Sequence, residues 1–274
     1  MTNIFEESLF SCCQQPTQSE EQTIKKEVIW NEDLLENVGG YYYDGKKQGI
    51  WKEKQGCVIL LGEYYNDLRT RRWIYIFNHL KIGGGLYNSV GKKKGKWIEV
   101  FEGFKNTAQV TYNGDYNVNG MKIGKWDIMY RFGNGEYQSM GGGSYDEEGN
   151  QKKIGKWVEL DEGFNYHKQI TYNGEYNMNG MKVGRWDTIF CNSYEYFLRI
   201  MQTLFIYKKI QIYSGGGSYN QEGNQKKIGR WEELDEQSNE QLLITYKGQY
   251  NVNGCKEGQW EKINRFQKNM IRHY

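Results

Sequence analysis

The chain has 274 residues, of which 34 are glycine and one is proline, with 16% aromatic and only 38% hydrophobic residues. This composition argues against a large conventional core, and against collagen, proline-rich disorder and a helical bundle. The net charge of +2, from 36 Lys and Arg against 34 Asp and Glu, excludes a strongly basic nucleic-acid-binding protein on bulk electrostatics. Short strands joined by glycine turns are favoured instead.

Residues 1–38 form a polar N-terminal segment, which we expect to be partly helical or disordered. Met1 to Cys13 lacks the basic start and apolar run of a signal peptide. No stretch of the chain reaches about eighteen apolar residues, so we expect no transmembrane segment. The odd number and irregular spacing of Cys12, Cys13, Cys57, Cys191 and Cys255 indicate free thiols in a reducing compartment.

A repeat array occupies residues 39–262, and eight of the nine tryptophans mark its units. One unit type reads YNGDYNVNGMKIGKW (112–126), YNGEYNMNGMKVGRW (172–186) and YKGQYNVNGCKEGQW (246–260). The other reads GGGSYDEEGNQKKIGKW (141–157) and GGGSYNQEGNQKKIGRW (215–231), with a looser copy at 83–97. The first pair, 39–51 and 62–73, is degenerate, as expected of a terminal capping repeat.

The spacing of these units is strict. The interval from Gly114 to Trp126 is 12 residues, and the later copies repeat it. The higher-order unit is therefore a pair of hairpins of about sixty residues. One link carries 14 extra residues within Phe190 to Ile212, which are either an elaborated loop or a mistranslated intron. Residues 263–274 form a C-terminal tail.

Each unit is predicted to be a β-hairpin. In residues 108–130 apolar and aromatic residues alternate with polar ones, the period of a half-buried strand. A two-residue Asn119-Gly120 turn would split the aromatic residues between both faces of the sheet. A three-residue loop, with Gly120 in the left-handed conformation of a G1 bulge, puts them on one face and is preferred. This register makes Tyr112 oppose Trp126 and Gly114 oppose Gly124, leaving a glycine furrow under the rings.

Charges are also repeated. Basic residues precede each repeat tryptophan and acidic residues follow it. In a stacked array they form two stripes, which either pair with each other across strands or offer a basic edge to an anionic surface. The candidate contacts for such a surface are Lys122, Lys125, Lys152, Lys153, Lys182, Arg185, Lys226 and Lys227.

The unit Tyr-x-Gly-x-Tyr-x-x-x-Gly-x-Lys-x-Gly-x-Trp resembles a MORN repeat, and more closely its variant form, over roughly residues 39–262. The chain has Gly-x-Trp where the usual MORN repeat has Gly-x-Gly, and the interleaved GGGSY unit is less typical. The resemblance implies an elongated meander of antiparallel hairpins. In members without a catalytic domain it implies scaffolding, protein contacts and proposed binding of acidic phospholipid.

The expected fold is thus all-β, a single-layer array of about sixteen strands that extends near 75 Å at roughly 4.8 Å per strand. The structural anchors are the repeat tryptophans and two glycines of each unit: Trp97, Trp126, Trp157, Trp186, Trp231, Trp260, Gly114, Gly124, Gly174, Gly184, Gly248 and Gly258. A sheet of this kind has one apolar face that must be covered. We expect part of it to stay exposed and to contact a protein partner or a second copy through Tyr112, Tyr116, Tyr172, Tyr176, Tyr246 and Tyr250.

No catalytic constellation emerges. His79, His167 and His273 are isolated from potential metal ligands, and the glycine runs lack the Lys-Ser/Thr of a phosphate loop. We therefore expect no enzyme activity, cofactor or metal. Carbohydrate binding on the aromatic rows and RNA binding between the basic residues are weaker alternatives, since the acidic stripe opposes RNA.

The function that the sequence favours is a non-enzymatic, cytoplasmic scaffold with protein partners, associated with the cytoskeleton or a membrane. The alternative is a module that binds anionic phospholipid or carbohydrate through the basic stripe or the aromatic face.

Overall fold

The computed structural model describes residues 38–133, 135–191, 211–239 and 241–265. The chain divides into two compact units, Met1–Val38 and Gly39–Tyr274. The expectations for residues 1–37, for most of the insertion near 190–212 and for the tail after residue 265 lie outside the described residues.

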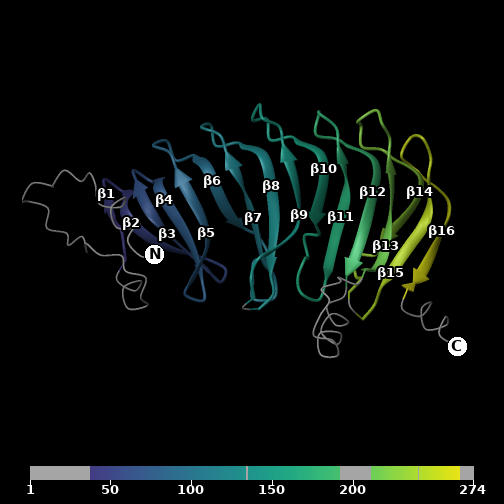
Figure 1. Ribbon diagram of the computed structural model, residues 1–274, viewed down its shortest axis with the longest axis horizontal. Coiled ribbons are helices and arrows are strands. Elements are labelled where there is room, and N and C mark those ends of the chain that lie inside the picture. The colour runs from purple at the N-terminus through teal and green to yellow at the C-terminus, as the bar shows by residue number, and fades with distance from the viewer. Residues whose placement is uncertain (1–37, 134, 192–210, 240, 266–274) are drawn as a thin grey trace, which may run out of the picture. The chain divides into compact units, whose positions relative to one another are not determined.

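Within the described residues of the second unit every named element is a β-strand, and the sixteen strands form one open sheet in chain order (Figure 1). Each strand pairs antiparallel with the next. The predicted all-β antiparallel meander is therefore confirmed. The strands are β1 Tyr41–Tyr43, β2 Lys46–Gln55, β3 Val58–Tyr65, β4 Leu68–Phe77, β5 Leu80–Tyr87, β6 Lys93–Val100, β7 Gln109–Tyr116, β8 Lys122–Arg131, β9 Gln138–Tyr145, β10 Lys153–Leu160, β11 Gln169–Tyr176, β12 Lys182–Cys191, β13 Gln211–Tyr219, β14 Lys227–Leu234, β15 Ile244–Tyr250 and β16 Lys256–Asn264.

The turn between β7 and β8 is the predicted three-residue loop. Gly120 has a φ of +77°, in the left-handed region. The backbone N–H of Asn117 donates to the carbonyl of Met121 at 2.9 Å, and the N–H of Gly120 donates to the carbonyl of Asn117 at 3.0 Å. The Asn117 side chain fixes the loop further by accepting from the backbone of Met121 at 3.0 Å. The asparagine that precedes the loop thus satisfies its free backbone donors.

The predicted register beyond this turn is wrong by two residues. Tyr116 opposes Lys122 as expected, but Tyr112 opposes Ile128 rather than Trp126. The reason is a bulge opposite Gly114, where β8 inserts extra residues and Gly124 adopts a φ of +58°. Gly124 therefore serves the left-handed backbone of a bulge and does not face Gly114 across a furrow. Gly184 and Gly258 repeat this conformation, with φ of +61° and +67°.

One aromatic ring from every strand joins a continuous ladder along one face of the sheet. Tyrosines from odd strands alternate with tryptophans from even strands, with centroids 5.0–6.3 Å apart and planes 75–89° apart. We call this row the ring ladder: Tyr42, Trp51, Tyr64, Trp73, Tyr87, Trp97, Tyr116, Trp126, Tyr145, Trp157, Tyr176, Trp186, Tyr219, Trp231, Tyr250 and Trp260. Each edge-to-face pair contributes about 0.5–1.5 kcal/mol beyond burial. The ladder therefore stabilises every strand pairing along the sheet.

Each ladder tryptophan lies over a glycine of the preceding strand or, for Trp51, over Gly40 just before β1. A Cβ on Gly114 would fall 2.2 Å from the Trp126 ring, and one on Gly174 would fall 2.1 Å from Trp186. The remaining pairs are Trp51 on Gly40, Trp73 on Gly62, Trp97 on Gly85, Trp157 on Gly143, Trp231 on Gly217 and Trp260 on Gly248. The absent side chain makes room for the indole, so the sheet packs its core within one layer.

At one end of the strands, loops fold back over the same face. Phe164, in the loop between β10 and β11, is buried with Val110 and Ile128 in one cluster. Phe104, in the loop between β6 and β7, packs edge-on against Phe77 with centroids 5.2 Å apart. These loops add apolar cover that a flat strand pattern does not predict.

Candidate functional site

The ring-ladder face carries four repeated charge clusters. Each consists of one glutamate between two cations and is called a triad below. The first triad is Lys47, Glu53 and Arg69; the second is Lys93, Glu99 and Lys122; the third is Lys153, Glu159 and Lys182; the fourth is Lys227, Glu233 and Lys256. Because two cations share one carboxylate, each triad has a net charge of +1.

The third triad illustrates the geometry. Lys153 precedes Trp157 on β10 and Glu159 follows it, so both side chains lie on the ladder face. Lys153 pairs with Glu159, and Lys182 from β12 reaches the same carboxylate at 3.0 Å. The Tyr176 hydroxyl on β11 donates to Glu159 at 2.8 Å. The triad thus connects three adjacent strands.

The lysines of the triads also cover the rings. Lys122 Nζ lies 4.0 Å from the centroid of the Trp126 ring, and Lys182 Nζ lies 3.8 Å from that of Trp186. A cation over an indole face contributes about 0.5–2 kcal/mol. The lysine stems therefore provide the cover that the apolar face requires, while their charges point to solvent and to the glutamates.

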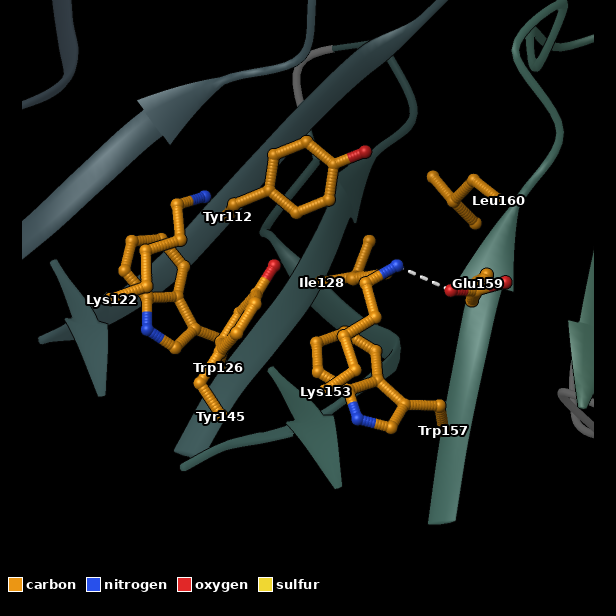
Figure 2. Close-up of a pocket in the computed structure, with 9 residues that line it drawn as sticks. All are labelled: Tyr112, Lys122, Trp126, Ile128, Tyr145, Lys153, Trp157, Glu159 and Leu160. Atoms are coloured by element: carbon orange, nitrogen blue, oxygen red, sulfur yellow. Dashed lines mark hydrogen bonds and ion pairs between the residues drawn. The ribbon is translucent and has the colours of Figure 1, made fainter. Parts of the chain in front are cut away.

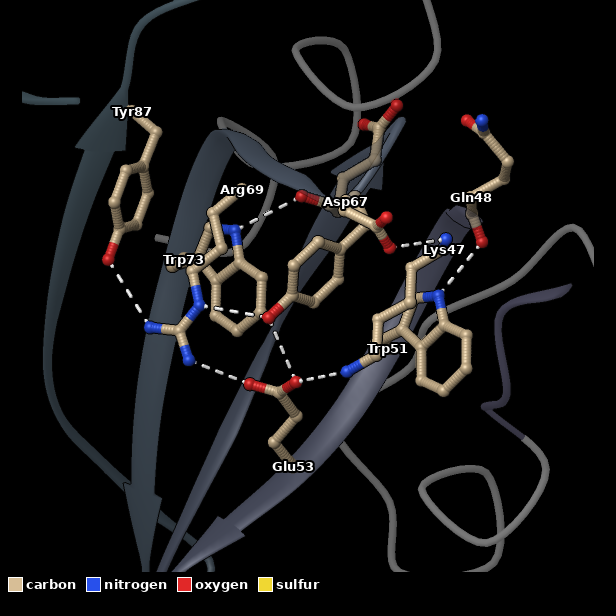
Figure 3. A network of polar contacts seen from close by, with 10 residues as sticks. Lys47, Gln48, Trp51, Glu53, Asp67, Arg69, Trp73 and Tyr87 are labelled. Atoms are coloured by element: carbon tan, nitrogen blue, oxygen red, sulfur yellow. Dashed lines mark hydrogen bonds and ion pairs between the residues drawn. The ribbon is translucent and has the colours of Figure 1, made fainter. Parts of the chain in front are cut away.

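The first triad departs from the others because an arginine takes the second cationic place (Figure 3). Arg69 reaches Glu53 at 2.7 Å and donates to the Tyr64 hydroxyl at 3.1 Å. It also donates to the Tyr87 hydroxyl at 3.3 Å. The planar guanidinium can contact all three groups at once, which a lysine cannot.

The triads set the protonation states on this face. Burial by itself raises the pKa of the Glu99 carboxyl, but Lys122 and Lys93 outweigh burial, so its pKa is lowered. Burial by itself also raises the pKa of the Glu159 and Glu233 carboxyls. Their neighbouring lysines outweigh burial, so the pKa of each carboxyl is lowered. Burial raises the pKa of Tyr116, and the hydrogen bond to Glu99 raises it further. The glutamates are therefore ionised and the tyrosines neutral around pH 7.

These shifts predict stability that is lost at both ends of the pH scale. A carboxyl with a lowered pKa stabilises the fold above its unfolded pKa of about 4.3, and this contribution disappears as the pH falls. A tyrosine with a raised pKa stabilises the fold below its unfolded value of about 10, and this contribution is lost as the pH rises. We expect a plateau of the melting temperature between about pH 5 and 9 and lower values at pH 3 and 11. A melting temperature unchanged from pH 6 to pH 3 would contradict the role of the triads.

A hollow of about 300 Å³ lies on this face between the second and third triads (Figure 2). Its polar lining is Lys122, Lys153, Glu159 and the hydroxyls of Tyr112 and Tyr145. The other lining residues are Trp126, Ile128, Trp157 and Leu160. Burial raises the pKa of Tyr112 and of Tyr145 to about 12, so both present a neutral hydroxyl to the hollow.

A second hollow of about 590 Å³ shares Lys122, Tyr145 and Lys153 with the first. It continues toward the loops of the hairpins, where its lining is polar. The further lining residues are Gln151, Lys152, Tyr176, Asn179, Gly180 and Gln225. We call the two hollows together the middle groove.

The structure separates the predicted basic contacts into three groups. Four of them, Lys122, Lys153, Lys182 and Lys227, are members of triads. Lys125 pairs with Asp127 at 2.9 Å and Arg185 pairs with Asp187 at 2.6 Å, both on the opposite face of the sheet. Lys152 and Lys226 lie in the loops before β10 and β14. The predicted pairing of the two charge stripes is therefore present, and no single basic edge gathers all eight residues.

The predicted partner face is mostly covered. Tyr116, Tyr176 and Tyr250 are buried in the ring ladder, so the expected exposed strip is wrong for them. Tyr112, Tyr172 and Tyr246 are half-buried. Their cover comes from neighbouring rings and from lysine stems.

Among the predicted anchors, Trp97, Trp126, Trp157, Trp186 and Trp231 are buried, and Trp260 on the last strand is half-buried. Gly114, Gly174 and Gly248 lie beneath indoles. Several residues of the site were missed: the shared carboxylates Glu99, Glu159 and Glu233, the tyrosines Tyr145 and Tyr219 of the GGGSY units, and Ile128 in the hollow. The fixed spacing of six residues from Lys93 to Glu99, repeated at Lys153 and Lys227, is the signal that could have found the triads.

No protein-family model matches this sequence, and no curated protein matches it significantly. Across the described strands and loops, no helix is long and apolar enough to cross a bilayer. Cys57, Cys191 and Cys255 are not joined in disulfide bonds, and Cys12 and Cys13 lie outside the described residues.

Proposed function

We propose that this chain is a MORN-like, non-enzymatic scaffold that makes protein contacts through the ring-ladder face. The observation that supports this proposal is the repetition of the triads. Their titratable groups recur four times in one arrangement, with an arginine for one lysine in the first copy, whereas the groups of an active site depart from the pattern of their neighbours. Regularly spaced clusters of +1 charge suit an extended acidic partner surface, because complementary charge speeds encounter and fixes register.

The proposed setting is the cytoplasm, at the cytoskeleton or the periphery of a membrane. Acidic phospholipid is a second candidate ligand, since the same +1 clusters would attract anionic headgroups. Carbohydrate binding is less supported. Sugars stack on open ring faces, whereas the faces of the ladder rings are occupied by the edges of neighbouring rings and by lysines.

The proposal predicts salt-sensitive capture of partner proteins from a cell extract by the immobilised full-length chain. Retention should fall roughly tenfold between low and physiological salt, because exposed charges are then screened. Lys152→Glu, on the ladder side and outside the triads, should weaken retention. Lys125→Glu, on the opposite face, is the matched control and should not.

Capture is measured by quantitative mass spectrometry against a blank matrix, with anionic vesicles as a parallel sample. If no protein is enriched over the blank, or if both variants behave as the parent does, the scaffold proposal fails. If only the vesicles bind, the lipid alternative replaces it.

A further inference from the structure

The repeat symmetry of the ring-ladder face is broken at the middle groove. The residue two positions after the tryptophan of β4, β8 or β12 faces the interval between two triads. In the first interval it is Tyr75, which is buried with its ring 6.3 Å from that of Trp97. In the second it is Ile128, and there the hollow is found. The smaller side chain leaves open the space that a tyrosine occupies in the first interval.

A second departure removes a negative charge from the same place. The residue after β10 is Asp161, whose carboxylate accepts a hydrogen bond from Tyr172 at 2.8 Å. The equivalent residue after β6 is Phe101, which packs near Tyr112 with centroids 6.3 Å apart. Consequently the Tyr112 hydroxyl has no hydrogen bond to any other residue that the structure describes. The same holds for Tyr145 within the described part of the chain.

Four donors therefore line one hollow: the ammonium groups of Lys122 and Lys153 and the hydroxyls of Tyr112 and Tyr145 (Figure 2). One carboxylate, Glu159, lines it as well, and it already serves Lys153 and Lys182. The triads on either side each have a net charge of +1. An anionic group is what this arrangement accepts, because it would be attracted by both triads and would accept hydrogen bonds from the hydroxyls.

The rest of the groove suits a peptide. The apolar lining at one end is Leu160 together with Ile128, of which only 3% is exposed. Toward the loops, Gln151, Asn179 and Gln225 supply carboxamides, which donate to and accept from peptide groups. β10, which runs beside the groove, has 8 residues, enough for an extended segment of about seven residues at roughly 3.3 Å each.

The charge of the array agrees with an acidic occupant. Residues 1–38 contain two of the 36 basic and eight of the 34 acidic residues, so residues 39–274 hold 34 basic and 26 acidic ones. Residues 39–274 therefore carry a net charge of +8, and residues 1–38 carry −6, which together give the +2 of the whole chain.

We propose that the middle groove binds an extended acidic peptide segment of a partner protein. An Asp or Glu carboxylate of the segment lies between Lys122 and Lys153. An aliphatic or aromatic side chain two residues away, on the same side of the extended segment, packs on Ile128 and Leu160. This inference rests on the proposed scaffold function. It specifies an acidic partner segment and places its binding site between the second and third triads.

The test uses the full-length chain and fluorescein-labelled nine-residue peptide pools. Glu and Leu are fixed two positions apart, and the other positions are mixtures of Ser, Gly and Thr. Matched pools replace Glu with Gln, or Leu with Ser. Anisotropy should show binding of the Glu/Leu pool, with affinity lower by about tenfold for the Gln pool because the charge-assisted contacts are lost.

Three variants locate the site. Ile128→Tyr copies the residue of the first interval and should fill the hollow, lowering affinity at least about tenfold. Phe101→Asp introduces the carboxylate that Asp161 provides in the later repeat. It should lower affinity several-fold, because this carboxylate repels the acidic peptide. Thr188→Tyr makes the corresponding change in the third interval and should leave binding within about twofold. Each variant adopts a residue type that the repeat already carries, and its melting temperature verifies folding.

The inference is overturned if the Gln pool binds as well as the Glu pool, or if Ile128→Tyr binds like the parent. It is also overturned if vesicles of phosphatidylcholine with one-fifth phosphatidylserine bind the parent, lose binding to Ile128→Tyr, and no peptide pool binds. If Ile128→Tyr retains the captured proteins as well as the parent does, the groove is not their binding site, and the scaffold proposal is unaffected. If peptides bind at the groove but no protein is captured from the extract, the scaffold proposal fails and the groove inference stands.

Discussion

Replacing Trp126 with alanine is expected to destabilise the array by about 3–5 kcal/mol, the usual range for a fully buried tryptophan. The Trp126 side chain is only 2% exposed, and it contacts ladder rings on both sides, Tyr116 at 5.3 Å and Tyr145 at 6.2 Å between centroids. Its loss empties the space over Gly114 and interrupts the ladder. Urea denaturation measures the total effect, and hydrogen exchange should place it in β7 to β9, because repeat arrays lose stability locally.

The partner of this tryptophan gives a sharper test. Gly114→Ala introduces a methyl group 2.2 Å from the indole, so it should destabilise the fold by about as much as the tryptophan substitution. In the double variant the indole is absent and the methyl has room, so the two effects should fall well short of their sum. Gly95→Ala is the control. Gly95 has a φ of +62° and no atom near its Cβ position, so only backbone strain of about 1 kcal/mol applies. Additive effects at Gly114 and Trp126 would show that the indole does not depend on the glycine.

The second large effect is expected at the carboxylate of a triad. Glu159→Gln keeps the size of the side chain and its bond to Tyr176, but it leaves Lys153 and Lys182 without a counter-charge. The Glu159 side chain is only 15% exposed and the two lysines are 34% and 23% exposed. We expect a loss of about 2 kcal/mol, below the 3–5 kcal/mol of a fully buried pair because solvent screens the lysines.

The control for this change is Asp187→Asn. Asp187 pairs with Arg185 at 2.6 Å, but the two side chains are 41% and 60% exposed, so the cost should stay within about 0.5 kcal/mol. The cost of Glu159→Gln should diminish as the pH falls through the lowered pKa of Glu159, because a protonated carboxyl offers the lysines no counter-charge. Equal costs at pH 7 would mean that the triads are ordinary surface pairs.

The local pattern of the sequence was sufficient for the hairpins and for their turns. The alternation in residues 108–130 predicted β7 and the start of β8, and Val118 to Gly120 predicted the loop. Both follow from interactions between near neighbours: side chains alternate along a strand, and glycine adopts a positive φ without a steric penalty. Repetition of two alternating hairpin units then made the one-sheet meander predictable.

The register beyond each bulge and the cover of the aromatic face were decided by tertiary structure. Gly124 is compatible with a furrow or with a bulge, and the residues next to it in the sequence do not determine which of the two forms. The choice depends on Trp126, whose indole fits only where the previous strand presents Gly114. The triads likewise require residues such as Lys153 and Lys182, 29 positions apart, to meet on one carboxylate. The sequence by itself determined which units repeat and where they turn, whereas contacts between strands decided what the rings and charges do, because those contacts exist only once the strands are paired.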